Sequence, residues 1–460
     1  MKNLQSRFLA FVNLSLMTMR KKLHGFLTGS FFLQYIDNII FILILALFAM
    51  SSFCETNVLG FVANVIFTLT VIKLLFVNGK KLKIDCIGLA LFLYLVFAFI
   101  SVINSTLLLS SFKGFLKTLT YLSFYFSLCV FLKDNYKKLP LILTLIAFVA
   151  FYESIYALFQ GFIGVRQIST WQDVSFLNPE EVLTRAYGTL KPYNPNLLGG
   201  YLLVCLSCPL ILSLLSLVKK HYKKAIIFAL MFAAIIVSII QTGCRGAYLG
   251  LFAFVFGLMI ISFKLINIES LKQTLKKIYI SLACFFTAVV FIYPPLQKRI
   301  LSIFLLRTDS STSFRLNVFK SSFEMFKDNF LFGIGQGNTT FREIYGLYMI
   351  SGFDALSAYN IYLETAVETG IFGLISFLTF IYFCLKEGFK YIFDKLNNIK
   401  YIITVCGTIL TLLAILTHGM FDTVFYRPQI QFIFWLNIAV LTTTVIYKRY
   451  GKCKEILNCN

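Results

Sequence analysis

The chain contains repeated apolar runs whose length suits a lipid bilayer. About 20 apolar residues in an α-helix cross the hydrocarbon core of a membrane. Of the 460 residues, 58% are apolar and 13% are charged. A helix satisfies its own backbone hydrogen bonds in lipid, whereas an open strand edge does not. We therefore expect an all-α polytopic membrane protein with about 12 transmembrane helices, at residues 37–54, 58–77, 86–104, 118–132, 139–160, 197–217, 225–240, 247–263, 277–293, 360–385, 401–417 and 430–447.

The charges of the connections alternate along the chain. A net charge of +22 would indicate a nucleic-acid partner in a soluble protein, but here short lysine clusters follow every second apolar run. Such clusters mark the cytoplasmic side of a membrane. We expect no nucleic-acid partner, both termini in the cytoplasm, and the inner (plasma) membrane as the location, with the thylakoid membrane as the alternative. The same rule places four connections outside, at residues 161–196, 241–246, 294–359 and 418–429.

The apolar runs and the basic ends of the sequence predict four regions. They are a basic N-terminal cytoplasmic segment (1–35), the first five transmembrane helices (36–160), a core with the outer loops 161–196 and 294–359 (161–445), and a basic cytoplasmic tail (446–460). Long loops inside a compact domain usually carry function.

Phenylalanines at near-helical spacing within residues 313–327 predict an amphipathic helix at the outer interface. The 11 cysteines lie mostly inside apolar runs and show no metal-ligand spacing. We therefore expect no metal and no cofactor.

An asparagine-proline-asparagine turn precedes the run that starts near residue 197. Asn194 and Asn196 flank the proline, and Arg185 and Lys191 lie shortly before the turn. A helix N-terminus with basic residues beside it suits an anionic head group. The alternative is a capped helix entry that binds no ligand.

Two further arginines lie on the expected outer side. Arg245 stands between two glycines at the membrane edge, where a charge calls for a partner; the alternative is an arginine that reaches lipid phosphate. Arg315 lies in the predicted outer helix. A glycine-rich loop follows it at residues 333–337, and such a loop is a weak signal for phosphate binding.

Glu364 and Glu368 are one helical turn apart, so their like charges repel. Either an arginine (Arg245, Arg315 or Arg427) neutralises them, or one carboxyl group takes up a proton. The alternative is an ion pair that only orders the helices.

His418, Asp422 and Arg427 crowd into one short outer connection. His418 is a candidate proton acceptor near neutral pH, and a buried, hydrogen-bonded histidine is the alternative.

Taken in order across residues 150–445, these motifs resemble the O-antigen ligase/polymerase superfamily of multi-pass membrane proteins. Within it the chain is most similar to the cyanobacterial IctB family of proposed inorganic-carbon (bicarbonate) transporters. That similarity rests on Trp171-Gln172-Asp173, the NPNLLGGY stretch, Ser357-Ala358-Tyr359 and the segment that begins at His418.

The resemblance implies a chemistry for the outer face. Ligases of the superfamily transfer a glycan from an undecaprenyl-diphosphate carrier without a metal, and two arginines hold the diphosphate; by motif these are Arg245 and Arg315. The ligase histidine that acts on the acceptor hydroxyl is replaced here by Tyr359, whose unperturbed pKa of about 10 makes it a poor base. Glu364, Glu368 and His418 are the other candidate bases.

Three functions remain open. The first is transfer of a glycan from a lipid-linked donor, bound by Arg185, Asn194, Asn196, Arg245, Arg315 and Arg427. The second is bicarbonate transport or an accessory role in carbon uptake. The third is a structural or regulatory membrane protein. We favour the first, with membrane lipids and an undecaprenyl-diphosphate-linked glycan, or else bicarbonate, as partners in the cell envelope.

Overall fold

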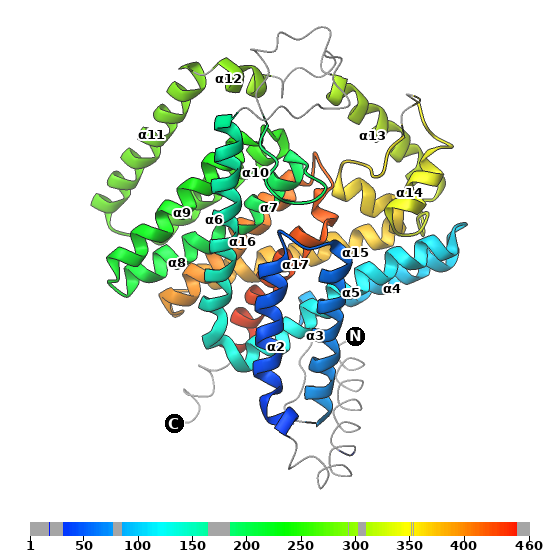
Figure 1. Ribbon diagram of the computed structural model, residues 1–460, viewed down its shortest axis with the longest axis horizontal. Coiled ribbons are helices and arrows are strands. Elements are labelled where there is room, and N and C mark those ends of the chain that lie inside the picture. The colour runs from blue at the N-terminus through cyan, green and yellow to red at the C-terminus, as the bar shows by residue number, and fades with distance from the viewer. Residues whose placement is uncertain are drawn as a thin grey trace.

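The computed structural model describes Thr18 and residues 31–76, 85–163, 185–292, 294–301, 310–350, 352 and 354–448. Within these residues the elements are helices and no strand occurs (Figure 1), which confirms the predicted all-α class. Most of the basic N-terminal segment, most of the tail, and the 171–173 stretch lie outside the described residues.

Eleven stretches of the described residues are long and apolar enough to cross a membrane, so the chain is a polytopic membrane protein. One of them, Leu108–Ile163, is 56 residues long and contains two helices joined by a short 3-10 turn. The division of this stretch accounts for the twelfth predicted helix. The fourth predicted helix was too short at its start, because the observed helix begins at Leu108 and includes a polar turn.

The first half of the chain forms one helix after another with short connections. Its helices are α2 (Phe31–Met50), α3 (Thr56–Phe76), α4 (Cys86–Asn104), α5 (Leu108–Asn135), η1 (Tyr136–Lys138), α6 (Leu139–Ile163), α7 (Pro195–Cys205), α8 (Ser207–Val218), α9 (Tyr222–Gln241) and α10 (Arg245–Leu265).

The second half alternates long helices with shorter ones in the connections. Its helices are α11 (Glu269–Ile292), α12 (Pro294–Leu301), α13 (Ser310–Asp328), α14 (Asn338–Tyr345), α15 (Ile361–Ile392), α16 (Ile399–His418), η4 (Val424–Tyr426), α17 (Pro428–Thr443) and η5 (Thr444–Lys448). Helix α13 confirms the helix predicted for residues 313–327; its place at a membrane interface stays a prediction.

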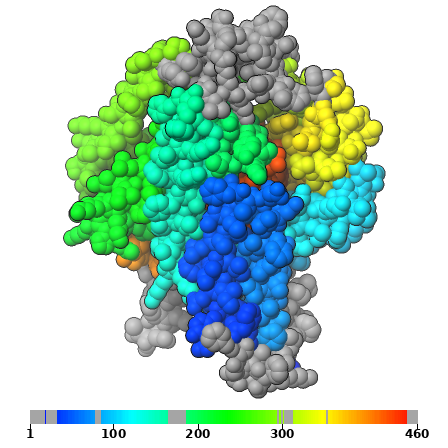
Figure 2. All heavy atoms as spheres, viewed as in Figure 1, coloured from blue at the N-terminus to red at the C-terminus, as the bar shows by residue number. Residues whose placement is uncertain are grey.

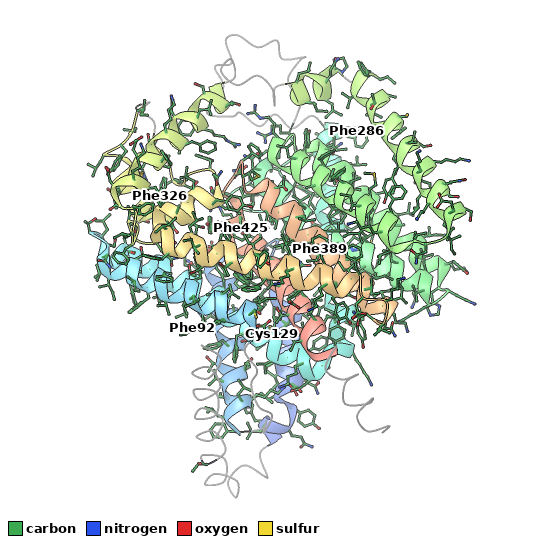
Figure 3. All side chains as sticks on the ribbon, turned by 180° about the vertical axis from the view of Figure 1, so that it is seen from behind. Phe92, Cys129, Phe286, Phe326, Phe389 and Phe425 are labelled. Carbon is green, nitrogen blue, oxygen red and sulfur yellow. The ribbon has the colours of Figure 1, made fainter. Side chains whose placement is uncertain are left out.

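The core lies around α17, where every residue from Gln429 to Thr443 is buried. Helices α7 and α16 pack against it, and Figure 1 shows these three in the middle of the bundle. Helix α11 lies at the edge instead, and none of its residues is buried. Two of the phenylalanines labelled in Figure 3 show the contrast, with Phe286 on the outer edge and Phe425 in the interior.

Proline and glycine interrupt two of the long helices. Pro209 has no N–H and its ring clashes with the carbonyl four residues earlier, which is Cys205, where α7 ends. Helix α15 is kinked at Gly370, whose φ of 68° is costly for other residues. A Cβ atom at Gly370 would lie 2.3 Å from the carbonyl oxygen of Leu331, so the kink lets a connecting loop pack against α15.

Candidate functional site

Asn194 and Asn196 have different tasks at the start of α7. The Asn194 side chain accepts a hydrogen bond from the Asn196 amide at 2.8 Å, and Pro195 needs no donor at the first helical position. The Asn196 side chain points elsewhere: its Oδ1 accepts from Arg185 Nη2 at 2.6 Å and its Nδ2 donates to Asp422 Oδ2 at 2.9 Å. Asn194 is therefore a helix cap, and Asn196 belongs to a polar cluster.

Arg185 links the start of α7 to the turn between α9 and α10. Its Nε donates to the carbonyl oxygen of Thr242 at 2.9 Å, in addition to its bond with Asn196. Burial lowers the pKa of the Arg185 guanidinium, and the positive charges of Arg315 and Arg245 act in the same direction. Three arginines from distant parts of the chain are thus close enough to repel one another.

Arg245 is the first residue of α10 and is half-buried. Its Nη1 donates to Thr312 Oγ1 at 3.0 Å, so it holds the start of α10 against α13. Thr312 lies one helical turn before Arg315 on α13, on the same side of the helix. This contact brings the two motif arginines to one place.

Arg315 contacts the connection between α16 and α17. Its Nη1 donates to the carbonyl oxygen of Phe421 at 2.6 Å and its Nη2 to Asp422 Oδ2 at 3.2 Å. The guanidinium also lies 5.3 Å from the centre of the Tyr359 ring, within the range of a cation–π interaction. Arg315 is therefore held on two sides, with 19% of its side chain exposed.

We call Arg185, Arg245 and Arg315, with Asn196 and Asp422, the arginine cluster. Three guanidinium charges and the one carboxylate of Asp422 sum to +3 − 1 = +2. The arginines are half-buried and Asp422 is 4% exposed, so water screens these charges less than at an open surface. Figure 2 shows a small patch of the orange-red C-terminal segment between green and yellow segments of the chain. The arrangement suits an anion.

Arg427, like Asn194, is a predicted ligand that does not join this cluster. It precedes α17, is exposed, and its side chain has no hydrogen bond or ion pair to the cluster among the described residues. Its closeness in sequence to Asp422 was misleading, because the η4 turn separates the two residues.

Tyr359 lies in the cluster's wall but is not suited to be its base. Burial raises the pKa of Tyr359, and the Asp422 carboxylate adds to this effect. The phenol therefore stays protonated at neutral pH. The ring of Phe314 meets Tyr359 edge-on at 5.9 Å, so Tyr359 packs against two neighbouring side chains of α13, Phe314 and Arg315, and keeps Arg315 in place.

His418 is completely buried, which contradicts a direct contact with substrate in this conformation. Its Nε2 lies 3.7 Å from Cys244 Sγ. A Cβ atom at Gly246 would lie 3.4 Å from the ring, and one at Gly200 3.6 Å from it, so His418 packs between two glycines. The alternative reading of a buried histidine fits, and these glycines serve helix packing.

The side chains of Glu364 and Glu368 contact backbone amides outside the arginine cluster. Glu364 Oε2 accepts from the Ala358 amide at 3.1 Å, and Glu368 Oε1 accepts from the Gly337 amide at 2.8 Å. Neither carboxylate forms an ion pair with an arginine among the described residues. Of the two predicted alternatives, the arginine partner is not observed, because Arg315 pairs with Asp422, and uptake of a proton by one carboxyl group stays a prediction.

The glycine-rich loop fastens helices together. The Gly335 amide donates to the carbonyl oxygen of Glu368 at 3.1 Å, and the Gln336 amide donates to Ser111 Oγ at 2.9 Å. With these amides bound to α15 and α5, the loop is not a phosphate cradle.

Sequence reasoning did not include Asp422, Thr312 or the carbonyl group of Phe421 among the site residues. Asp422 carried a signal, because it was the one acidic residue in the crowded outer connection. Thr312 and a backbone carbonyl carry none, since their roles depend on how α13 packs.

Comparison with known proteins gives one family. No curated protein matches the chain. Residues 199–378 match the family model described as O-Antigen ligase, a region that contains Arg245, Arg315 and Tyr359, whereas Arg185, Asn196 and Asp422 lie outside it. The similarity of this membrane-embedded chain to the O-antigen ligase family is therefore shown for residues 199–378.

Proposed function

We propose that the arginine cluster binds the diphosphate of a lipid-linked glycan donor at the non-cytoplasmic face, and that the protein transfers the glycan to an acceptor. The main support is the convergence of Arg245 and Arg315, brought together by the bond from Arg245 to Thr312 on α13. Both arginines lie in the region that matches the O-antigen ligase family.

The charge and geometry of the cluster fit such a donor. A diphosphate that joins a lipid to a sugar carries two negative charges, which balance the cluster's excess of +2. Guanidinium groups bind phosphate oxygens with two parallel hydrogen bonds. In a half-buried site they also stabilise the charge that grows on the departing diphosphate. The N-termini of α7 and α10 add partial positive charge at the same place.

The acceptor's proton needs a base other than Tyr359 or His418. Asp422 is the carboxylate of the cluster, and its Oδ2 accepts hydrogen bonds from both Arg315 and Asn196. Binding of the donor's phosphates draws Arg315 away from this oxygen. Asp422 then accepts the proton from the acceptor hydroxyl as the glycan moves.

The test replaces Arg245 or Arg315 with lysine in the organism that makes the protein. Lysine keeps the charge but loses the planar fork, so we expect both variants to lose the glycan that the protein adds to the cell surface. Arg342→Lys is the matched control, because Arg342 is exposed and pairs with Asp354 away from the cluster.

Normal surface glycan in Arg245→Lys and Arg315→Lys cells, at unchanged protein level, would contradict the proposal. If the same variants lost bicarbonate uptake, transport of bicarbonate would be the better account of the cluster.

A further inference from the structure

A second polar site lies inside the bundle, apart from the arginine cluster. It is a cavity of about 90 Å³ between α4, α5, α15 and α17, closed at one end by the loop around Gln336. Glu364 and Glu368 line it and are only 2% and 7% exposed. Lys117 and Asn338 are its exposed lining residues, so they mark the side on which it opens.

Three oxygen atoms that line this cavity accept no hydrogen bond among the described residues. Gln336 is 2% exposed, and its Oε1 has no partner, although its Nε2 donates to Tyr94 at 3.4 Å. Each glutamate uses one carboxylate oxygen to accept a backbone amide, and its second oxygen has no such donor. Of these atoms Gln336 Oε1 is fully buried, and a buried acceptor without a donor is costly, so the cavity suits a ligand that donates hydrogen bonds.

The carboxylates that line the cavity favour a positively charged ligand. When both carboxyl groups are ionised, they and the Lys117 ammonium sum to −2 + 1 = −1. Without a bound cation, the repulsion between the two carboxylates favours a proton on one of them. Lys117 forms no ion pair with either glutamate within the described part of the chain. One positive charge bound between the carboxylates would make the cavity neutral.

Six aromatic residues form a large part of the remaining wall of the cavity. They are Tyr94, Tyr121, Phe377, Phe425, Tyr426 and Trp435, and Phe425 is labelled in the interior in Figure 3. Aromatic faces attract organic ammonium groups. Hard divalent metal ions instead take about six oxygen ligands, and no group of three metal-ligating side chains occurs in the described residues.

We propose that this cavity binds a primary ammonium group. Its three N–H donors match the three acceptors of Glu364, Glu368 and Gln336, its charge neutralises the cavity, and its carbon chain lies against the aromatic walls. The source is either the ethanolamine head group of a membrane lipid or a free amine. The proposal does not depend on glycan transfer, because it uses none of the arginine cluster.

The test measures thermal unfolding of the full-length protein in a neutral detergent, with ethylammonium chloride as the probe. We expect the unfolding temperature to rise with probe concentration and to saturate. Tetramethylammonium chloride and sodium chloride at equal ionic strength should give no saturable rise, because neither cation has N–H donors. Equal shifts with all three salts, or no shift with ethylammonium, would overturn the proposal.

Variants locate the effect in the cavity. Glu368→Gln still accepts the Gly337 amide but loses the charge, so it should weaken the probe's apparent affinity at least tenfold, as expected for a charge-assisted hydrogen bond. Glu269→Gln is the control, since Glu269 is exposed at the start of α11. Gln336→Met, which keeps both carboxylates, should also weaken binding. Wild-type affinity in both cavity variants would refute the site.

Lipid nanodiscs separate the two sources of the ammonium group. If the ligand is a lipid, wild-type protein should unfold at a higher temperature in phosphatidylethanolamine than in phosphatidylcholine, whose amine is methylated, and Glu368→Gln should remove the difference. Equal temperatures in the two lipids, together with a saturable ethylammonium effect, would identify a soluble amine.

Discussion

Asp422 holds the arginine cluster together through both of its carboxylate oxygens. Oδ2 accepts from Arg315 at 3.2 Å and from Asn196 at 2.9 Å, and Oδ1 accepts from the Val424 amide at 3.1 Å. Through Asn196 the network reaches Arg185. One acidic residue thus positions side chains from three separate segments, and it does so where the proposed reaction needs a base.

Replacing Asp422 with asparagine separates binding from catalysis. The amide oxygen of Asp422→Asn keeps an acceptor of the same shape but is not a base. We expect the rate of glycan transfer to fall by about 100-fold or more, while the donor binds as tightly as before or more tightly, because a negative charge has been removed. The measurement is the kcat and KM of purified protein with a lipid-linked glycan.

Asp354→Asn is the control for this experiment, because Asp354 forms an exposed ion pair with Arg342 outside the cluster. If Asp422→Asn raised KM and left kcat unchanged, Asp422 would only position the donor.

Motif spacing was enough to predict part of the site. Arg245 and Arg315 follow from their glycine-flanked and helical settings, and Arg185 and Asn196 from the turn before α7. The partners of Glu364 and Glu368 could not be predicted, because a helical repeat shows which residues share a face but not which loop covers it. The sequence also left open whether His418 is buried, because its burial depends on two glycines in other helices.

Small residues let the central helices pack closely. A Cβ atom at Gly250 of α10 would lie 2.5 Å from a methyl group of Leu203 and 2.7 Å from the carbonyl oxygen of Ala414. Helix α10 therefore touches α7 and α16 at this point without a side chain between them. Since Arg245 begins α10, this packing also sets the position of the arginine cluster.

Gly250→Ala should disturb that packing. We expect it to destabilise the protein by about 1–3 kcal/mol, as for other overpacked cores, and to lower the unfolding temperature measured in detergent. Gly60→Ala in α3 is the matched control, because a Cβ atom there meets nothing within 4 Å. The control should be stabilised by roughly 0.5–1 kcal/mol, since alanine favours a helix more than glycine does. Equal unfolding temperatures would show that α10 shifts freely.

Helix positions were largely predictable from the sequence, and helix ends were not. Apolar length gave the membrane-spanning helices because lipid leaves few alternatives. The start of α5 was missed because its first two turns hold serines and a lysine, and the Ser111 hydroxyl among them accepts a hydrogen bond from the glycine-rich loop. From the sequence alone, such polar helical turns are interpreted as loops, because the segment that packs against them is not known.

At the scale of the whole molecule, the buried ion pairs of the described residues form two separate groups. In one group Lys73 is buried between Asp37 and Asp134, at 2.6 and 3.1 Å, and Lys138 donates to Asn38. The other group is the arginine cluster with the connections that hold it. This division agrees with the alternation of charge along the chain, and the side that each group faces stays a prediction from the positive-inside rule.

The central claim is that the arginine cluster recognises a lipid diphosphate. Its most direct test is the affinity of undecaprenyl diphosphate for the purified protein, measured by native mass spectrometry with undecaprenol as the uncharged comparison. We predict that the diphosphate binds and the alcohol does not, that Arg245→Lys and Arg315→Lys each weaken binding at least tenfold, and that Arg342→Lys binds like wild type. Equal binding of the alcohol and the diphosphate, or wild-type affinity in all three variants, would contradict the claim.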